Sequence, residues 1–169
     1  CVMKRTDAVS VFLRHTLLAP LVLTAVVASG TVQANGHAEA EAVEQVLKQK
    51  PFAESRVALQ ISDADLSKQT LILNVASNLI KHYGQDEVDV EIIAFGPGLD
   101  LLLQDNEQAS RIAALADQGV RFSACQNSAT NMSKKLGQEL ELNPDARLVP
   151  AGIVRLVQLD AAGYSIAKP

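Results

Sequence analysis

Cys125 is the residue of this sequence with the clearest capacity for chemistry. It ends a short run of alternating side chains that begins at Val120, and it precedes Asn127, Ser128 and a helical pattern. That order predicts a strand, a tight turn and the start of a helix. A thiol at such a place faces free N–H groups and the positive end of a helix dipole, which favour the nucleophilic thiolate. Cys125 is therefore our candidate reactive residue.

A structural role is the alternative interpretation of Cys125. A lone cysteine at the end of a core strand is more commonly a small buried hydrophobe. The second cysteine, Cys1, precedes the expected initiator Met3 and belongs to a segment that we expect to be removed. Cys125 would then have no internal disulfide partner, so in an exported protein it would be buried, paired between chains or chemically active.

Four further residues are candidate ligand contacts near Cys125. The backbone N–H groups of Asn127 and Ser128 would steady the charge of a thiolate, although capping of the helix is the alternative role of both residues. Gly96 and Gly98 flank a proline after a predicted strand, where backbone can approach a ligand closely or form a plain turn. In a parallel sheet these segments meet at the carboxyl edge, where open α/β sheets bind ligands.

The elements that must position these residues alternate along the chain. Strands are predicted at Arg56–Ile61, Val88–Phe95, Val120–Cys125 and Arg147–Val149, with helical patterns between them. Parallel strands need crossover connections, so this order predicts a parallel sheet with helices on both faces.

Two finer expectations concern side-chain direction within these elements. At the start of the second predicted strand, Asp89 and Glu91 alternate outward. In the last predicted helix, Ile153, Leu156 and Val157 form the buried face.

The N-terminal region is typical of a secretory signal peptide. Three basic residues precede an uncharged apolar run, Leu17–Ala28, and small residues at Val32 and Ala34 have signal-peptidase spacing. The run is shorter than the roughly 20 residues that span a bilayer, and Pro20 interrupts it, so a retained membrane helix is the weaker alternative. We therefore predict a periplasmic or secreted protein with no stable membrane insertion after signal removal.

Composition limits the remaining possibilities. The 169 residues, 48% of them hydrophobic, suffice for one domain with its own core. We assign residues 1–34 to the signal peptide, 35–54 to an N-terminal arm or short helix, and 55–169 to the domain. The net charge of −4 and the lack of a basic stripe argue against nucleic acid as a partner. Three scattered histidines, at positions 15, 37 and 82, predict no metal site, and we expect no cofactor.

Three stretches resemble the DsrE/DsrF-like family: Val120–Ser128 (VRFSACQNS), Phe95–Leu103 (FGPGLDLLL) and Leu148–Pro169 (LVPAGIVRLVQLDAAGYSIAKP). The resemblance covers Arg56 to Pro169. It implies a three-layer α/β/α sandwich with a mainly parallel five-stranded sheet and assembly into homo-oligomers. It also implies that Cys125 occupies the position of the cysteine that carries sulfane sulfur as a persulfide. The family's relay proteins are cytoplasmic, so an exported member must have different partners.

Two functions from different classes are therefore open. The first is an exported sulfur carrier that exchanges sulfane sulfur at Cys125 with small sulfur species or a thiol-bearing acceptor protein; whether it turns over as a sulfurtransferase is left open. The second is a non-catalytic oligomeric binding or assembly module with a structural or redox-sensing cysteine. Disulfide exchange is a weaker third function, because the predicted mature chain has no resolving cysteine.

Overall fold

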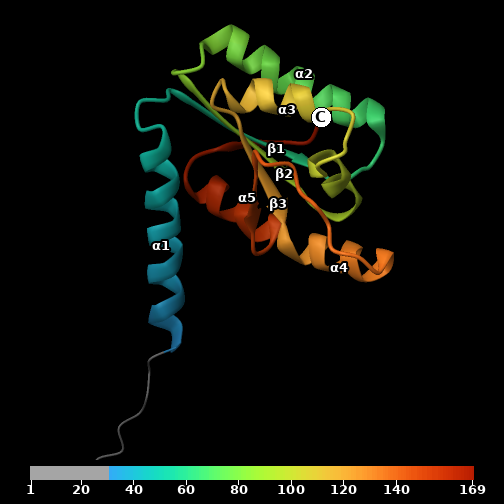
Figure 1. The fold of residues 1–169 in the computed structure, drawn as a ribbon. Coiled ribbons are helices and arrows are strands. Elements are labelled where there is room, and N and C mark those ends of the chain that lie inside the picture. The colour runs from blue at the N-terminus through green and yellow to red at the C-terminus, as the bar shows by residue number, and fades with distance from the viewer. Residues whose placement is uncertain (1–30) are drawn as a thin grey trace, which may run out of the picture.

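A computed structural model describes residues 31–169 of the chain (Figure 1). The predicted signal peptide falls almost wholly outside these residues and stays a prediction. In chain order the elements are α1 (Thr31–Gln49), β1 (Ser55–Ile61), α2 (Leu66–Tyr83), β2 (Val88–Ala94), the 3-10 helix η1 (Gly96–Leu102), α3 (Ala109–Ala116), β3 (Arg121–Cys125), α4 (Gln126–Leu136), β4 (Ala146–Val149), α5 (Gly152–Ala161) and β5 (Ser165–Ala167).

The strands form one parallel sheet with the order β4-β3-β2-β1-β5. Helices α2 and α3 cover one face, and α5 covers the other with α1 beside it (Figure 1). The first four strands follow one another across the sheet, whereas the chain returns from β4 to the far side of β1. Since crossovers are right-handed, the reversed step puts α5 on the opposite face. The predicted α/β sandwich with a five-stranded parallel sheet is confirmed.

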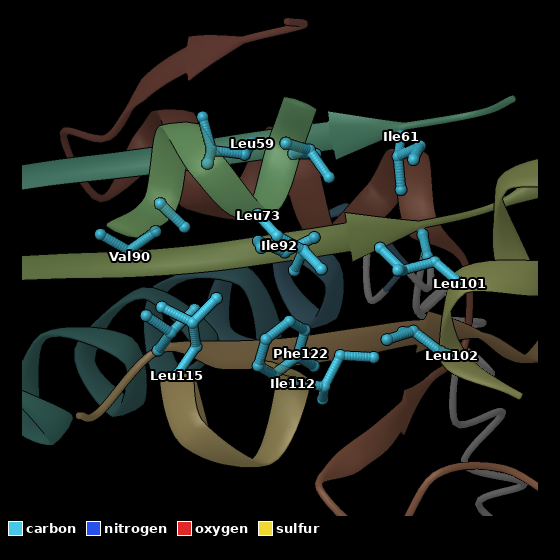
Figure 2. Close-up of a cluster of buried hydrophobic side chains, with 14 of the residues drawn as sticks. Leu59, Ile61, Leu73, Val90, Ile92, Leu101, Leu102, Ile112, Leu115 and Phe122 are labelled. Carbon is cyan, nitrogen blue, oxygen red and sulfur yellow. The ribbon is translucent and has the colours of Figure 1, made fainter. Parts of the chain in front are cut away.

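The larger apolar core lies between the sheet and helices α2 and α3. Every second side chain of the strands points into it, as expected for a period of two, and Leu59, Ile92 and Phe122 sit there side by side (Figure 2). Leu73 of α2 and Ile112 of α3 cover them and are fully buried. Each such side chain stabilises the fold by roughly 1.5–3 kcal/mol on burial.

The smaller core lies on the other face, where α5 packs against Ile93 of β2 and Val46 of α1. Leu156 and Leu159 form the buried stripe of α5. The prediction that Ile153 and Val157 are buried is wrong, because both are 62% exposed. They lie beside the stripe of Leu156 and Leu159 on the helix and therefore face outward.

The prediction that Asp89 and Glu91 point outward is also wrong. Both are buried, because β2 is the central strand and α5 covers this face of it. Glu91 accepts hydrogen bonds from three arginines and a serine. Its donors are Arg155 (Nε 2.7 Å, Nη2 2.8 Å), Arg147 (Nη2 2.9 Å), Arg121 (Nε 3.1 Å) and the hydroxyl of Ser123 (2.6 Å).

Asp89 extends this buried polar cluster towards the C-terminal segment. Its carboxylate accepts hydrogen bonds from Arg121 and from the Tyr164 hydroxyl. Burial and the bond to Asp89 together raise the pKa of Tyr164 to about 12. Tyr164 therefore stays neutral near pH 7, and the charge of the two carboxylates is balanced by the arginines, with Lys50 also acting on Asp89.

Helix α1 is longer than the short helix that the sequence predicts. It begins at Thr31, so it runs through the predicted cleavage point after Ala34, and Val46 packs against α5. Among the described residues, no helix has the length and apolar character needed to cross a bilayer.

The ion pairs of Glu91 predict an acid-sensitive fold. Burial raises the pKa of Glu91, but the hydrogen bond from Arg155 and the charges of Arg147 and Arg121 outweigh burial and lower it from 4.5 to about 2. A carboxylate with a lowered pKa stabilises the fold above its unfolded pKa and loses that contribution as pH falls. We expect denaturant unfolding to show a loss of about 3 kcal/mol between pH 4.5 and pH 2 from this group.

Glu91→Gln provides the matched control for this prediction. The amide is nearly isosteric but cannot balance the arginines, so the variant should be less stable at pH 7 and should lack this part of the acid dependence. Parallel stability curves for the two proteins between pH 5 and pH 2 would contradict the assignment.

Candidate functional site

Cys125 lies where the chain leaves two neighbouring strands in opposite directions. It ends β3 and is paired in register with Val149, which ends β4. After β3, helix α4 turns towards the face covered by α2 and α3, where Ala129 and Met132 contact the larger core. After β4, helix α5 turns to the other face. Such a switch point at the carboxyl edge is where open α/β sheets bind ligands.

The sulfur of Cys125 is flanked by the starts of two helices. Cys125 is itself the N-cap residue of α4, in an extended conformation, and Gly152 begins α5 directly beside it. The residue is buried, with 5% of its surface exposed. The positive ends of two helix dipoles therefore meet near one buried thiol, and both favour negative charge there.

Hydrogen-bond donors around the sulfur decide its ionisation. Burial raises the pKa of Cys125, but the Ser128 hydroxyl and the backbone N–H groups of Gly152, Ser128 and Asn127 together lower it below its ordinary value. In α4 itself the neutral thiol makes no side-chain capping bond. The donors thus act mainly on the anion, which is the form that attacks sulfur.

Ser128 connects the thiol to the segment after β2. Its Oγ accepts a hydrogen bond of 2.7 Å from the Gly96 N–H. Since the oxygen accepts this bond, the hydroxyl proton is left to be donated to the Cys125 sulfur. Gly96 has a φ of +57°, a left-handed conformation that favours glycine, and it begins η1 where the sequence predicts a turn. Gly96 thus contributes through its backbone N–H, by way of Ser128.

The remaining predicted site residues have different positions. Asn127 is exposed, and its backbone N–H contributes to the environment of the thiol. Gly98 is buried against β1: a Cβ added there would lie 2.5 Å from the Ile61 carbonyl oxygen. Gly98 therefore allows close packing of η1 on β1, and its surface is not available to a ligand.

Gly152 is a further residue of the site and was not among the predicted contacts of Cys125. Its N–H is one of the donors to Cys125, and an added Cβ would lie 3.0 Å from Cβ and Cδ1 of Phe95. A side chain here would press α5 away from the thiol. The sequence signal that was available is a glycine three positions after the predicted strand that ends at Val149.

A cavity of about 310 Å³ is lined by Ser128 and the segment after β2. Gly96, Pro97 and Met132 form much of its wall, and Lys135 lies at its edge. The space suits a small molecule or the end of a side chain. Within the described part of the chain, no three His, Cys, Asp or Glu side chains come together as a metal site would require.

Comparisons with known proteins support the fold. No protein-family model and no curated protein matches the sequence. Among solved structures, the chain is similar to MTH1491, a protein of unknown function from Methanobacterium thermoautotrophicum, with 26% identity and a TM-score of 0.61. The match covers 69% of this chain and 100% of that one. This similarity supports the α/β architecture of the chain.

Loss of the Ser128 hydroxyl should weaken ionisation of Cys125. In Ser128→Ala the pKa of Cys125 should rise, because a direct donor to the thiolate is lost. We expect alkylation of the folded protein by iodoacetamide at pH 7 to slow by roughly threefold to tenfold. The measurement is the alkylation rate as a function of pH.

Ser133→Ala, on the same helix but not among the donors to the sulfur, is the matched control and should react like the wild type. Equal pH profiles for Ser128→Ala and the wild type would contradict the role given to this hydroxyl.

Proposed function

We propose that this protein carries a sulfane sulfur atom on Cys125 in the form of a persulfide. The observation that supports the proposal is the convergence of four donors, from two helix starts and one hydroxyl, on a single buried thiol whose pKa they lower. A thiolate is needed both to accept sulfane sulfur and to be released when the sulfur is passed on. The resemblance to the DsrE/DsrF-like family points to the same chemistry.

The transfer is an exchange at sulfur. The Cys125 thiolate attacks the outer sulfur of a small persulfide, a new S–S bond forms, and the bond between that sulfur and the donor breaks. The donor leaves as a thiolate that takes up one proton, so sulfur is transferred with no external oxidant. Attack by an acceptor thiolate on the outer sulfur then returns Cys125 to its thiolate form.

In this proposal the outer sulfur of the persulfide occupies the cavity that Ser128 lines. A persulfide is longer than a thiol by one S–S bond of about 2 Å. In this proposal the extension brings the outer sulfur past Ser128 towards the cavity that Ser128 lines, where a thiol-bearing acceptor would approach. The donors around the inner sulfur keep stabilising negative charge while the outer sulfur is exchanged.

The setting of this activity is also proposed. A predicted export signal favours a periplasmic or secreted protein, so donor and acceptor would be small sulfur species or exported thiol proteins. Homo-oligomeric assembly belongs to the same proposal, since it is implied by the family resemblance.

A second candidate function, an assembly module with an inert cysteine, is favoured by one observation. Three apolar side chains of α5 are between 51% and 62% exposed: Ile153, Val154 and Val157. A patch of this kind is typical of a surface that contacts another protein.

Intact mass of the purified protein after incubation with polysulfide separates the two candidates. The sulfur-carrier function predicts a mass gain of one or more sulfur atoms, removed by dithiothreitol, in the wild type and not in Cys125→Ser. Retention of the gain in Cys125→Ser would place the sulfur elsewhere. No gain, together with alkylation that needs denaturant, would overturn the proposal and favour the assembly module.

A further inference from the structure

A second cavity, of about 300 Å³, lies between α1, α5 and the edge strand β4. Its polar lining consists of Arg147, Arg155 and the side-chain amides of Gln45, Gln49 and Gln158. The remaining lining residues, Val46 and Val154 among them, are apolar or carry only backbone polar groups. No aspartate or glutamate lines it, so every charged group that faces this cavity is a guanidinium.

The guanidinium charge behind this cavity exceeds the carboxylate charge. Arg121, Arg147 and Arg155 form one cluster with Asp89 and Glu91, which leaves one positive charge in excess. Both carboxylates are buried in the sheet, and Arg121 lies between them. The excess charge therefore falls to Arg147 and Arg155, which line the cavity. A negative charge bound in a partly desolvated space of this kind is attracted to the guanidinium groups more strongly than one at an open surface.

Several side-chain hydrogen-bond donors that line the cavity have no close acceptor among the described residues. Arg155 directs Nε and Nη2 to Glu91, and among the described residues no side chain or carbonyl accepts from its Nη1. Nor is that nitrogen among the fully buried atoms of the described residues that lack a partner, and Arg155 lines the cavity. Arg147 Nη1 has only a long bond of 3.4 Å to Gln49. The amides of Gln45 and Gln158 make no hydrogen bond to a described residue.

We propose that this cavity binds a small oxygen-bearing anion, an inorganic oxyanion or a carboxylate, through Arg147, Arg155, Gln45 and Gln158. Planar guanidinium groups and side-chain amides are the donors that suit such oxygens. The anion supplies the missing negative charge, and the volume admits an ion or a short dicarboxylate. This site does not include Cys125, so the anion-binding proposal does not depend on the sulfur-carrier function.

Calorimetric titration and side-chain NMR of the purified protein test the site. The probes are sulfate and succinate, titrated at constant ionic strength with chloride as the reference ion. We expect saturable binding of at least one probe, with shifts of the Arg155 Nε–Hε signal and of the Gln45 and Gln158 amide signals. Binding of sulfate alone would indicate an inorganic oxyanion, and binding of succinate alone a carboxylate; both outcomes support the site.

Three variants of cavity residues test where the anion binds, and two of them leave the buried ion pairs intact. Arg147→Gln removes a cavity charge and should weaken binding about tenfold or more. Gln158→Leu and Gln45→Leu break no ion pair, so they should stay folded and weaken binding severalfold. Gln118→Leu, in the turn after α3 and outside the cavity lining, is the matched control, and Cys125→Ser should bind like the wild type.

Three results would overturn the site. The first is the absence of saturable binding of both probes beyond that of chloride. The second is wild-type affinity in all three cavity variants. The third is a set of NMR shifts that maps to α4 and not to α1, β4 and α5.

Discussion

The buried carboxylate of Glu91 is the interaction on which the arrangement of the α5 face depends. Desolvating one such charge costs several kcal/mol, and only close, multiple partners offset the cost. Glu91 of β2 obtains them from β3, β4 and α5, so one side chain ties four elements together. Removing any of its arginines would leave part of that cost uncompensated.

The same network holds the candidate site together. Arg155 belongs to the first turn of α5, and its two bonds to Glu91 fix that turn against the sheet. Gly152, at the start of this turn, then presents its N–H to Cys125. Ser123, which donates to Glu91, lies two positions before Cys125 on the same face of β3. The charge cluster thus holds the start of α5, and with it the Gly152 donor, beside the thiol.

The fold could be predicted because its signals are local. Strand alternation, helical spacing and capping residues each extend over a few positions. Together they predicted the first four strands, the helices between them and the place of Cys125 at a helix start, whereas a fifth strand was expected only from the family resemblance. Asp89 and Glu91 were mispredicted because alternating acids in a strand usually mark a solvent face. The arginines that compensate Glu91 lie 30, 56 and 64 positions away, and no local pattern connects them.

The site was predictable only in part, for a similar reason. The backbone donors of Asn127 and Ser128 come two and three positions after Cys125. They could be predicted because the first N–H groups of a helix have no partner within the helix. The donor from Gly152 depends on the pairing of β3 with β4, which sequence periodicity does not specify. Ile153 and Val157 were mispredicted because a short apolar helix offers more than one stripe, and only packing on the sheet selects Leu156 and Leu159.

The central claim is that the pKa of Cys125 lies below that of an ordinary cysteine because donors from two helices and Ser128 surround it. Its most direct test is a pH titration of the native protein followed by the ultraviolet absorbance of the thiolate, with Cys125→Ser as the blank. The account predicts a Cys125-dependent transition at a pH below that of an ordinary cysteine. A transition at or above the ordinary pKa of cysteine, or none before the protein unfolds, would contradict it.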